Sequence, residues 1–153
     1  MPTELDVLKE HLRLGTYMFV STWAPWSFTC WYDLTDDLEF VFLSKETRRH
    51  SGELRERPDA CGAVLNEVPE GGPGNPVKGV YFEGPVECLR GEPLARAYEG
   101  YANRWRDAPD VPSLDHIVSR DNADRLWMLR PTGFVLFDAV NFPKDPRREI
   151  RSW

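Results

Sequence analysis

The chain has 153 residues, of which 41% are hydrophobic, 12% aromatic and 29% charged, and this composition predicts one globular domain over residues 1–153. Its net charge of −6 and pI near 5.1 argue against nucleic-acid or anionic-membrane partners, because both need a basic surface. No segment has the length of a membrane span, and no N-terminal leader pattern is found. We therefore expect a cytoplasmic protein.

The first predicted element is an amphipathic helix over residues 3–14. Thr3 can cap its start and Gly15 can end it. Its apolar face carries Leu5, Leu8 and Leu12. We expect this helix to act as a lid on the rest of the fold.

Three strands are predicted next, at residues 16–23, 27–34 and 38–43, because these segments are rich in β-branched and aromatic side chains. Turn residues separate them, with Ala24-Pro25 in the first gap and Thr35-Asp36-Asp37 in the second. Gaps this short join antiparallel neighbours, so the pattern predicts an antiparallel meander.

A short basic helix is predicted directly after the third strand, with the hydroxyl of Ser44 as its cap and Pro58 as its limit. Arg48, Arg49 and His50 then fall near its start, where the helix dipole disfavours each cation by roughly 0.3–1 kcal/mol. An anion bound at the helix start would resolve this conflict, and phosphate is the commonest such anion.

The same helix has a simpler interpretation as a solvated, salt-paired face. Arg49 and Glu53 are spaced i,i+4, and so are Glu46 and His50. Pairs of this kind stabilise a helix by about 0.2–0.5 kcal/mol each without any ligand.

The second half of the chain continues with strands joined by short connections. A strand is predicted at residues 60–68, a Gly- and Pro-rich loop at 69–76, and a long strand at 77–89. The Gly84-Pro85 pair within that long strand predicts a bulge or bend at a barrel corner.

A helix over residues 93–105 follows, because apolar residues there recur at spacings of three, four and seven. Two last strands, at residues 125–130 and 133–137, are predicted to turn about Pro131-Thr132. Five to seven strands in hairpins with three helices predict a mostly β (α+β) fold, a small antiparallel barrel with peripheral helices.

Motifs of nucleophilic, nucleotide-binding and zinc-hydrolase sites are absent, so the sequence names no catalytic residue. His116 is a candidate base, with a structural histidine as the favoured alternative. The three cysteines, Cys30, Cys61 and Cys88, are widely spaced and lack any CxxC pair. This spacing favours reduced, buried thiols over a disulfide or a metal site.

Aromatic residues crowd the first two strands and the turn between them. They are Trp23, Trp26, Phe28, Trp31 and Tyr32. They could form a wall for a planar ligand, but a strand-rich core uses the same residue types, so core packing is the favoured interpretation.

Taken together, these motifs resemble the pyridoxamine 5′-phosphate oxidase-like, FMN-binding split-barrel proteins. The segment from Ser44 through Arg49-His50 to Pro58 resembles that family's T-x4-R-K-x4-[IL]-x3-P segment. Residues 79–105 resemble its long strand and flanking helix, and residues 126–138 resemble its closing hairpin. Arg49-His50 and Trp153 also resemble a small bacterial branch of the family.

The resemblance implies a split barrel that forms a homodimer with FMN at the subunit interface, and a flavin-dependent oxidoreductase acting on a small molecule. The flavin phosphate would lie at the start of the basic helix, against Ser44, Arg48, Arg49 and His50. The edge of the isoalloxazine ring would meet the second strand at Thr29, Cys30 and Trp31. The deazaflavin F420, which the same fold binds, is the alternative cofactor.

The chain departs from the family pattern at three positions. Phe28 and Asp33 stand where flavin-binding members have Arg and Lys, and His50 stands where they have Lys. These residues favour a second hypothesis, a non-enzymatic split-barrel dimer that binds another anionic ligand or no cofactor.

Overall fold

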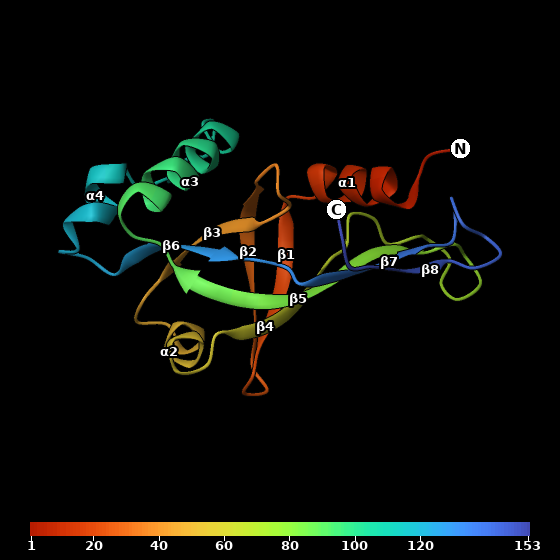
Figure 1. Ribbon diagram of the computed structural model, residues 1–153, viewed down its shortest axis with the longest axis horizontal. Helices are drawn as coiled ribbons and strands as arrows, with labels where there is room; N and C mark the ends of the chain where they lie inside the picture. The colour runs from red at the N-terminus through yellow and green to blue at the C-terminus, as the bar shows by residue number, and fades with distance from the viewer.

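The computed structural model describes residues 1–153 and contains eight strands and four helices (Figure 1). The strands are β1 (Tyr17–Thr22), β2 (Ser27–Leu34), β3 (Phe40–Lys45), β4 (Asp59–Val64), β5 (Lys78–Cys88), β6 (Asp124–Leu129), β7 (Gly133–Asp138) and β8 (Arg147–Ile150). The helices are α1 (Glu4–Leu14), α2 (Arg49–Glu56), α3 (Gly91–Arg104) and α4 (Leu114–Ser119).

Six strands close into an antiparallel barrel in the order β1-β2-β3-β6-β5-β4, because β4 pairs with both β5 and β1. Strands β7 and β8 extend the sheet from β5. Closure lets every strand of the barrel bury one face without leaving an open edge. The predicted mostly β, antiparallel barrel is confirmed.

Helix α1 packs its apolar face against the barrel, as predicted. The Thr3 hydroxyl accepts a hydrogen bond from the Asp6 amide at 3.1 Å, and the Asp6 carboxylate accepts one from the Thr3 amide at 3.1 Å. Leu8 and Leu12 are fully buried in the barrel core, and burial of each such side chain contributes about 1.5–3 kcal/mol. Gly15 ends the helix.

Strands β1, β2 and β3 form the predicted antiparallel meander. In the β1–β2 hairpin the even-numbered residues, such as Met18 and Cys30, face the core, whereas the odd-numbered residues face outward. Tyr17 lies opposite Trp31, and Phe19 lies opposite Thr29. This alternation places a row of aromatic and hydroxyl side chains on the outside of the barrel.

The predicted helix cap at Ser44 is wrong. Strand β3 continues through Ser44 and Lys45, because both pair with β6, and the Glu46 amide still donates to the Ala123 carbonyl at 2.8 Å. Helix α2 begins four residues later, after Arg48, which occupies the cap position without any side-chain hydrogen bond. The pairing of Ser44 and Lys45 with β6 therefore shifts the start of the helix to Arg49.

The long strand β5 changes partner on one edge at Gly84-Pro85, from β7 to β6, while its pairing with β4 continues through this pair without a bulge. A hairpin between β6 and β7 is not formed, because both strands run antiparallel to β5 and lie end to end along one of its edges. The Thr132 amide donates to the Glu83 carbonyl at 2.8 Å across this junction. A Cβ at Gly84 would collide with the Arg130 carbonyl, so the junction requires glycine.

Two short elements were missed in the sequence. Helix α4 has six residues and is capped by Ser113, and β8 has four residues that pair with β7. The predicted strand over residues 60–68 also ends at Val64. Cys61 is exposed on β4 rather than buried, because it lies on the outer face of the barrel, whereas Cys30 is buried.

Apolar residues form two clusters. The larger one fills the barrel, and the smaller one lies outside it, where α3 and α4 cover Val41 of β3 and Leu126 of β6 (Figure 1). Strands β3 and β6 are consequently buried on both faces, which leaves the outer face of β1 and β2 as the more open side. No helix is long and apolar enough to cross a membrane.

Candidate functional site

The tip of the β1–β2 hairpin contacts the basic helix α2. The Trp23 indole donates to the Glu53 carbonyl at 2.9 Å, and the Thr22 hydroxyl donates to the Glu53 carboxylate at 2.5 Å. The guanidinium of Arg49 lies 4.3 Å from the centre of the Trp26 ring. These contacts hold the helix start beside the outer face of the hairpin.

Arg49 is already paired within the protein. Its Nε lies 2.6 Å from Oε1 of Glu53, as expected for the salt-paired helix face. The hydrogen bond from Thr22 and then the contact with Arg49 lower the pKa of Glu53. The expected pair between Glu46 and His50 is not formed, because each residue has other partners.

His50 is turned into the fold rather than toward solvent. It is 9% exposed, its ring stacks on Phe28 with centroids 3.7 Å apart, and its Nε2 lies 2.7 Å from the Ser44 hydroxyl. Burial, reinforced by the charge of Arg48, lowers the pKa of His50, so the ring is neutral at pH 7. The hydroxyl of Ser44 and the ring of His50 are therefore hydrogen-bonded to each other.

Arg48 is the cation left open at this site. Its side chain is exposed and makes no hydrogen bond or ion pair. The first turn of α2 holds no acidic residue, and the amides of Arg49 and His50 have no acceptor within the protein. Unpaired amides at a helix start attract anions, so Arg48 and these two amides are the candidate anion-binding groups.

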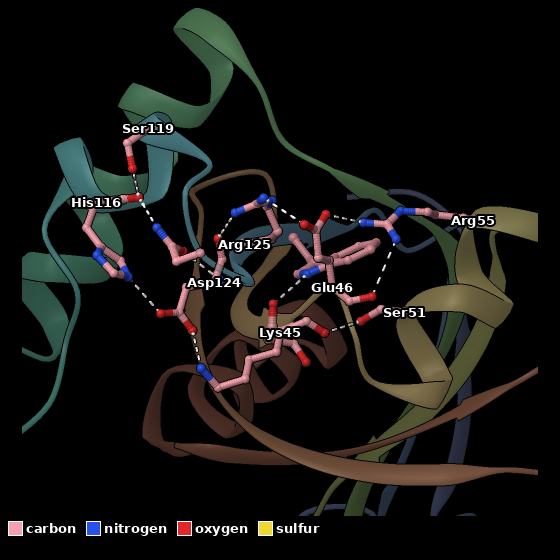
Figure 2. A network of polar contacts seen from close by, with 11 residues as sticks. Lys45, Glu46, Ser51, Arg55, His116, Ser119, Asp124 and Arg125 are labelled. Carbon is pink, nitrogen blue, oxygen red and sulfur yellow. Dashed lines mark hydrogen bonds and ion pairs between the residues drawn. The ribbon is translucent and has the colours of Figure 1, made fainter.

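A polar network behind α2 fixes its position against β3 and β6 (Figure 2). Glu46 receives hydrogen bonds at 2.8 Å from both Arg55 of α2 and Arg125 of β6. The Ser51 hydroxyl donates to the Lys45 carbonyl at 2.8 Å. Because Arg125 is only 2% exposed, Glu46 provides the negative charge that this buried guanidinium needs.

His116 belongs to the outer part of the same network. Its Nε2 lies 2.9 Å from the carboxylate of Asp124, which also contacts Lys45 at 3.1 Å (Figure 2). Burial by itself would raise the pKa of Asp124, but the hydrogen bonds from His116 and Lys45 lower it overall. His116, the candidate base, thus links α4 to the barrel through its contact with Asp124.

The predicted ring-contacting residues of β2 have three different environments. The Thr29 hydroxyl lies 2.6 Å from the Tyr17 hydroxyl on the outer face. Cys30 points into the core, and burial raises the pKa of its thiol, so it is an inert packing residue. Trp31 is 55% exposed and contacts Tyr17 and Trp105, with centroid distances of 4.7 and 5.4 Å.

The favoured core role of the aromatic cluster is correct for Tyr32 and wrong for the tryptophans. Trp23, Trp26 and Trp31 are each 41–55% exposed, because they lie at the hairpin tip or on the outer face of β2. Tyr17 was not predicted as a site residue. The odd–even alternation of the two strands could have placed it beside Trp31.

Comparison with known proteins gives no match to a family model or to a curated sequence. Solved structures do match. A heme-binding protein from Mycobacterium smegmatis superposes with a TM-score of 0.69 at 17% identity, over 99% of this chain and 59% of that protein. A protein assigned as a pyridoxamine 5′-phosphate oxidase from Listeria innocua gives 0.58 at 16% identity, over 86% and 95% of the two chains. The chain has the split-barrel fold of the pyridoxamine 5′-phosphate oxidase-like proteins.

A third structure with this split barrel is an F420 reductase, with a TM-score of 0.58 at 20% identity over 82% of this chain and 94% of that one. Identities this low concern the fold alone. The chain spans about three-fifths of the length of the Mycobacterium smegmatis protein. The predicted split barrel is therefore confirmed. The nature of its ligand depends on this chain's own residues.

Proposed function

We propose that this split barrel binds FMN along the outer face of its β1–β2 hairpin. Arg48 and the open amides of Arg49 and His50 would hold the phosphate, with the Arg49 side chain beside it. The flavin ring would lie against β2 from Thr29 to Trp31. The observation that carries the proposal is that α2, which begins at the unpaired Arg48, packs on the tip of the hairpin whose outer face exposes Trp31.

The dimensions and chemistry of this face fit an elongated ligand with one anionic end and one flat end. Trp26, beside Arg49, and Trp31 are five residues apart on extended chain, which corresponds to roughly 17 Å. Between them lie the hydroxyls of Ser21 and Ser27, 2.8 Å apart, which can bond the polar chain of FMN. Bound flavin would supply redox chemistry on a small molecule, while the protein positions it.

The charges at the phosphate end indicate modest affinity. Glu53 neutralises Arg49, and neutral His50 bonds Ser44, so Arg48 is the main free cation. We expect a Kd on the order of 1–100 μM for FMN, weaker than a site with several free cations would give. F420, which also carries a phosphate and a flat ring, is the alternative flavin.

We further propose that the protein is a homodimer. Three apolar side chains beside the proposed ligand face are 43–48% exposed: Phe19 of β1, Leu65 directly after β4, and Tyr81 of β5. Contiguous exposed apolar side chains of this kind mark protein contacts. Size-exclusion chromatography with light scattering tests this, and a monomer at micromolar concentration would contradict it.

The cysteines support a cytoplasmic location. All three are free, and Cys61 is exposed. Exposed free thiols persist in reducing compartments, whereas secreted proteins pair them. Fractionation of cells expressing the full chain checks this expectation.

The deciding experiment for the ligand is a titration of purified protein with FMN and F420, followed by flavin absorbance and tryptophan fluorescence. FMN should quench the fluorescence and raise the melting temperature. Arg48→Ala should weaken FMN binding at least tenfold, whereas Arg96→Ala, an exposed arginine on α3, should leave it unchanged. If neither flavin changes fluorescence or melting temperature, the flavin proposal fails.

Heme is the second candidate, and one observation favours it. The heme-binding protein from Mycobacterium smegmatis matches 99% of this chain, while Phe28 stacked on His50 leaves the phosphate end short of cations. Titration with hemin tests this candidate. A Soret band that shifts on addition of protein and saturates at one heme per chain supports heme over flavin.

A non-enzymatic dimer is the remaining alternative. It predicts that an anion such as phosphate binds at Arg48 while flavins do not, and that reduced FMN is not reoxidised faster with the protein than without it. Inorganic phosphate titrated against the wild type and Arg48→Ala distinguishes this case from both cofactor proposals.

A further inference from the structure

An aromatic hollow lies on the other side of Trp31, between β2 and the segment that follows α3. Its volume is about 370 Å³, within the range of roughly 300–1,000 Å³ that is typical of small-molecule sites. The lining side chains include Trp31, Tyr101, Trp105, Pro109, Asp110 and Val111. The hollow therefore combines aromatic and aliphatic walls with a single carboxylate, Asp110.

The two tryptophans form a corner of this hollow. Their ring centroids are 5.4 Å apart and their planes meet at 61°, so a group placed in the corner touches both indoles. Trp31 is 55% exposed, whereas Tyr101 of α3 is 6% exposed and belongs to the smaller apolar cluster. Aromatic faces carry negative electrostatic potential, and cations within about 6 Å of a ring centre are attracted to them.

The charges around the hollow favour a positive ligand. Asp110 is exposed and makes no hydrogen bond or ion pair. Asp33 lies against Gly100 of α3 and outside the lining. Burial raises the pKa of its carboxyl, while the charge of Arg104 acts to lower it. Asp110 is thus the carboxylate at the hollow that lacks a salt-bridge partner.

Arg104 is the cation closest to these groups, but it does not line the hollow. Its guanidinium donates to the carbonyls of Gly15 and Arg13 and lies 5.4 Å from the centre of the Trp105 ring. Within the protein, Arg104 therefore already makes a cation–π contact with Trp105, one of the two indoles of the hollow.

We propose that the hollow binds a small organic cation that carries an alkylated ammonium group. The ammonium lies in the corner of Trp31 and Trp105 near Asp110. The site shares Trp31 with the proposed flavin face, but it is separate from the phosphate end of the hairpin.

The test uses choline and its neutral carbon isostere, 3,3-dimethyl-1-butanol, titrated into the full chain with tryptophan fluorescence and calorimetry as readouts. The two molecules have the same shape and differ in charge. Choline should bind with a Kd at least tenfold lower than that of the isostere. Equal binding of the two, or binding of neither, would overturn the proposal.

Matched variants locate the site. Asp110→Asn should weaken choline binding at least fivefold, whereas Asp107→Asn, an exposed neighbour outside the lining, should leave it unchanged. Trp31→Ala should abolish the fluorescence response, with circular dichroism used to check the fold. Arg48→Ala should lower affinity for FMN without changing that for choline, so the two proposals fail separately. Equal losses in the two aspartate variants would contradict the assignment.

Discussion

Phe28 and His50 stack face to face, with ring centroids 3.7 Å apart and planes inclined by 11°. These are two of the positions at which the family resemblance implies cations, so an aromatic pair occupies the place of two positive charges. The pair holds α2 to the barrel through packing, and the neutral His50 ring also bonds Ser44. Aromatic packing therefore stabilises this part of the split barrel where the resemblance implies positive charges.

The buried imidazole should make stability depend on pH above the range in which carboxylates titrate. The folded-state pKa of His50 is lowered from its ordinary value of 6.5, so below about pH 6.5 the unfolded chain binds more protons than the folded chain. Stability should therefore be fully present above that pH and fall as the pH drops toward the folded-state pKa. Urea unfolding at pH 8, 7, 6 and 5 measures this.

The control for that pH dependence is His50→Phe, which keeps the stack on Phe28 but cannot be protonated. Its unfolding free energy should change less than that of the wild type between pH 7 and pH 5. The lowered pKa values of Glu53 and Asp124 act at lower pH, below their ordinary values of 4.5 and 3.8. Identical pH profiles for the two proteins would show that His50 is not responsible.

Arg49→Ala should have a small effect on stability. It removes an exposed contact with Glu53 and the cation–π contact with Trp26, which together contribute about 0.5–1.5 kcal/mol. FMN affinity should fall less than in Arg48→Ala, because Glu53 already neutralises Arg49. Urea unfolding and an FMN titration measure both effects, and the reverse order of affinity loss would contradict the assignment of Arg48 as the main free cation.

Glu46→Gln should destabilise the network of Figure 2 by about 2–4 kcal/mol, because it leaves the buried guanidinium of Arg125 without a counter-charge. Adding Arg125→Met should recover much of that loss, since a methionine needs no counter-charge. A double-mutant cycle by urea unfolding measures the coupling. Additive single losses would show that the two residues act independently.

Gly84→Ala should cost at least about 2 kcal/mol, since its Cβ would collide with the Arg130 carbonyl at the β6–β7 junction. Gly52→Ala is the matched control, because a Cβ there meets no atom within 4 Å and alanine is favoured in a helix by about 0.5–1 kcal/mol. Thermal unfolding of both variants should shift in opposite directions. A stable Gly84→Ala protein would mean that the two strands can separate at this point.

Local patterns predicted the parts of the fold that depend on neighbours in sequence. The capped helix α1 and the odd–even alternation of β1 and β2 follow from side-chain spacing, and they led to a closed antiparallel barrel. The predictions failed where a distant strand decides the outcome. Pro131-Thr132 has the residues of a turn, yet the edge of β5 keeps β6 and β7 collinear.

Only part of the candidate site was predicted, again because sequence patterns determine local structure and not contacts between distant segments. Arg48 and Arg49 lie at the start of a helix as expected, because helix propensity is local. The inward turn of His50 depends on Phe28 of another element, and the exposure of Trp23, Trp26 and Trp31 depends on which face of the barrel they occupy. Neither the inward turn of His50 nor the exposure of the tryptophans can be predicted from a single sequence segment.

Strand β8 is the last strand of the sheet, and its outer backbone has no partner strand. An open strand edge of this kind can recruit strands from other chains and start fibrous assembly. Arg147 and Glu149 of β8 and the adjacent Arg151 are charged and bonded to one another or to Glu83, which makes the edge a poor template. Replacing these three residues with valine should therefore make the protein prone to polymerise through this edge.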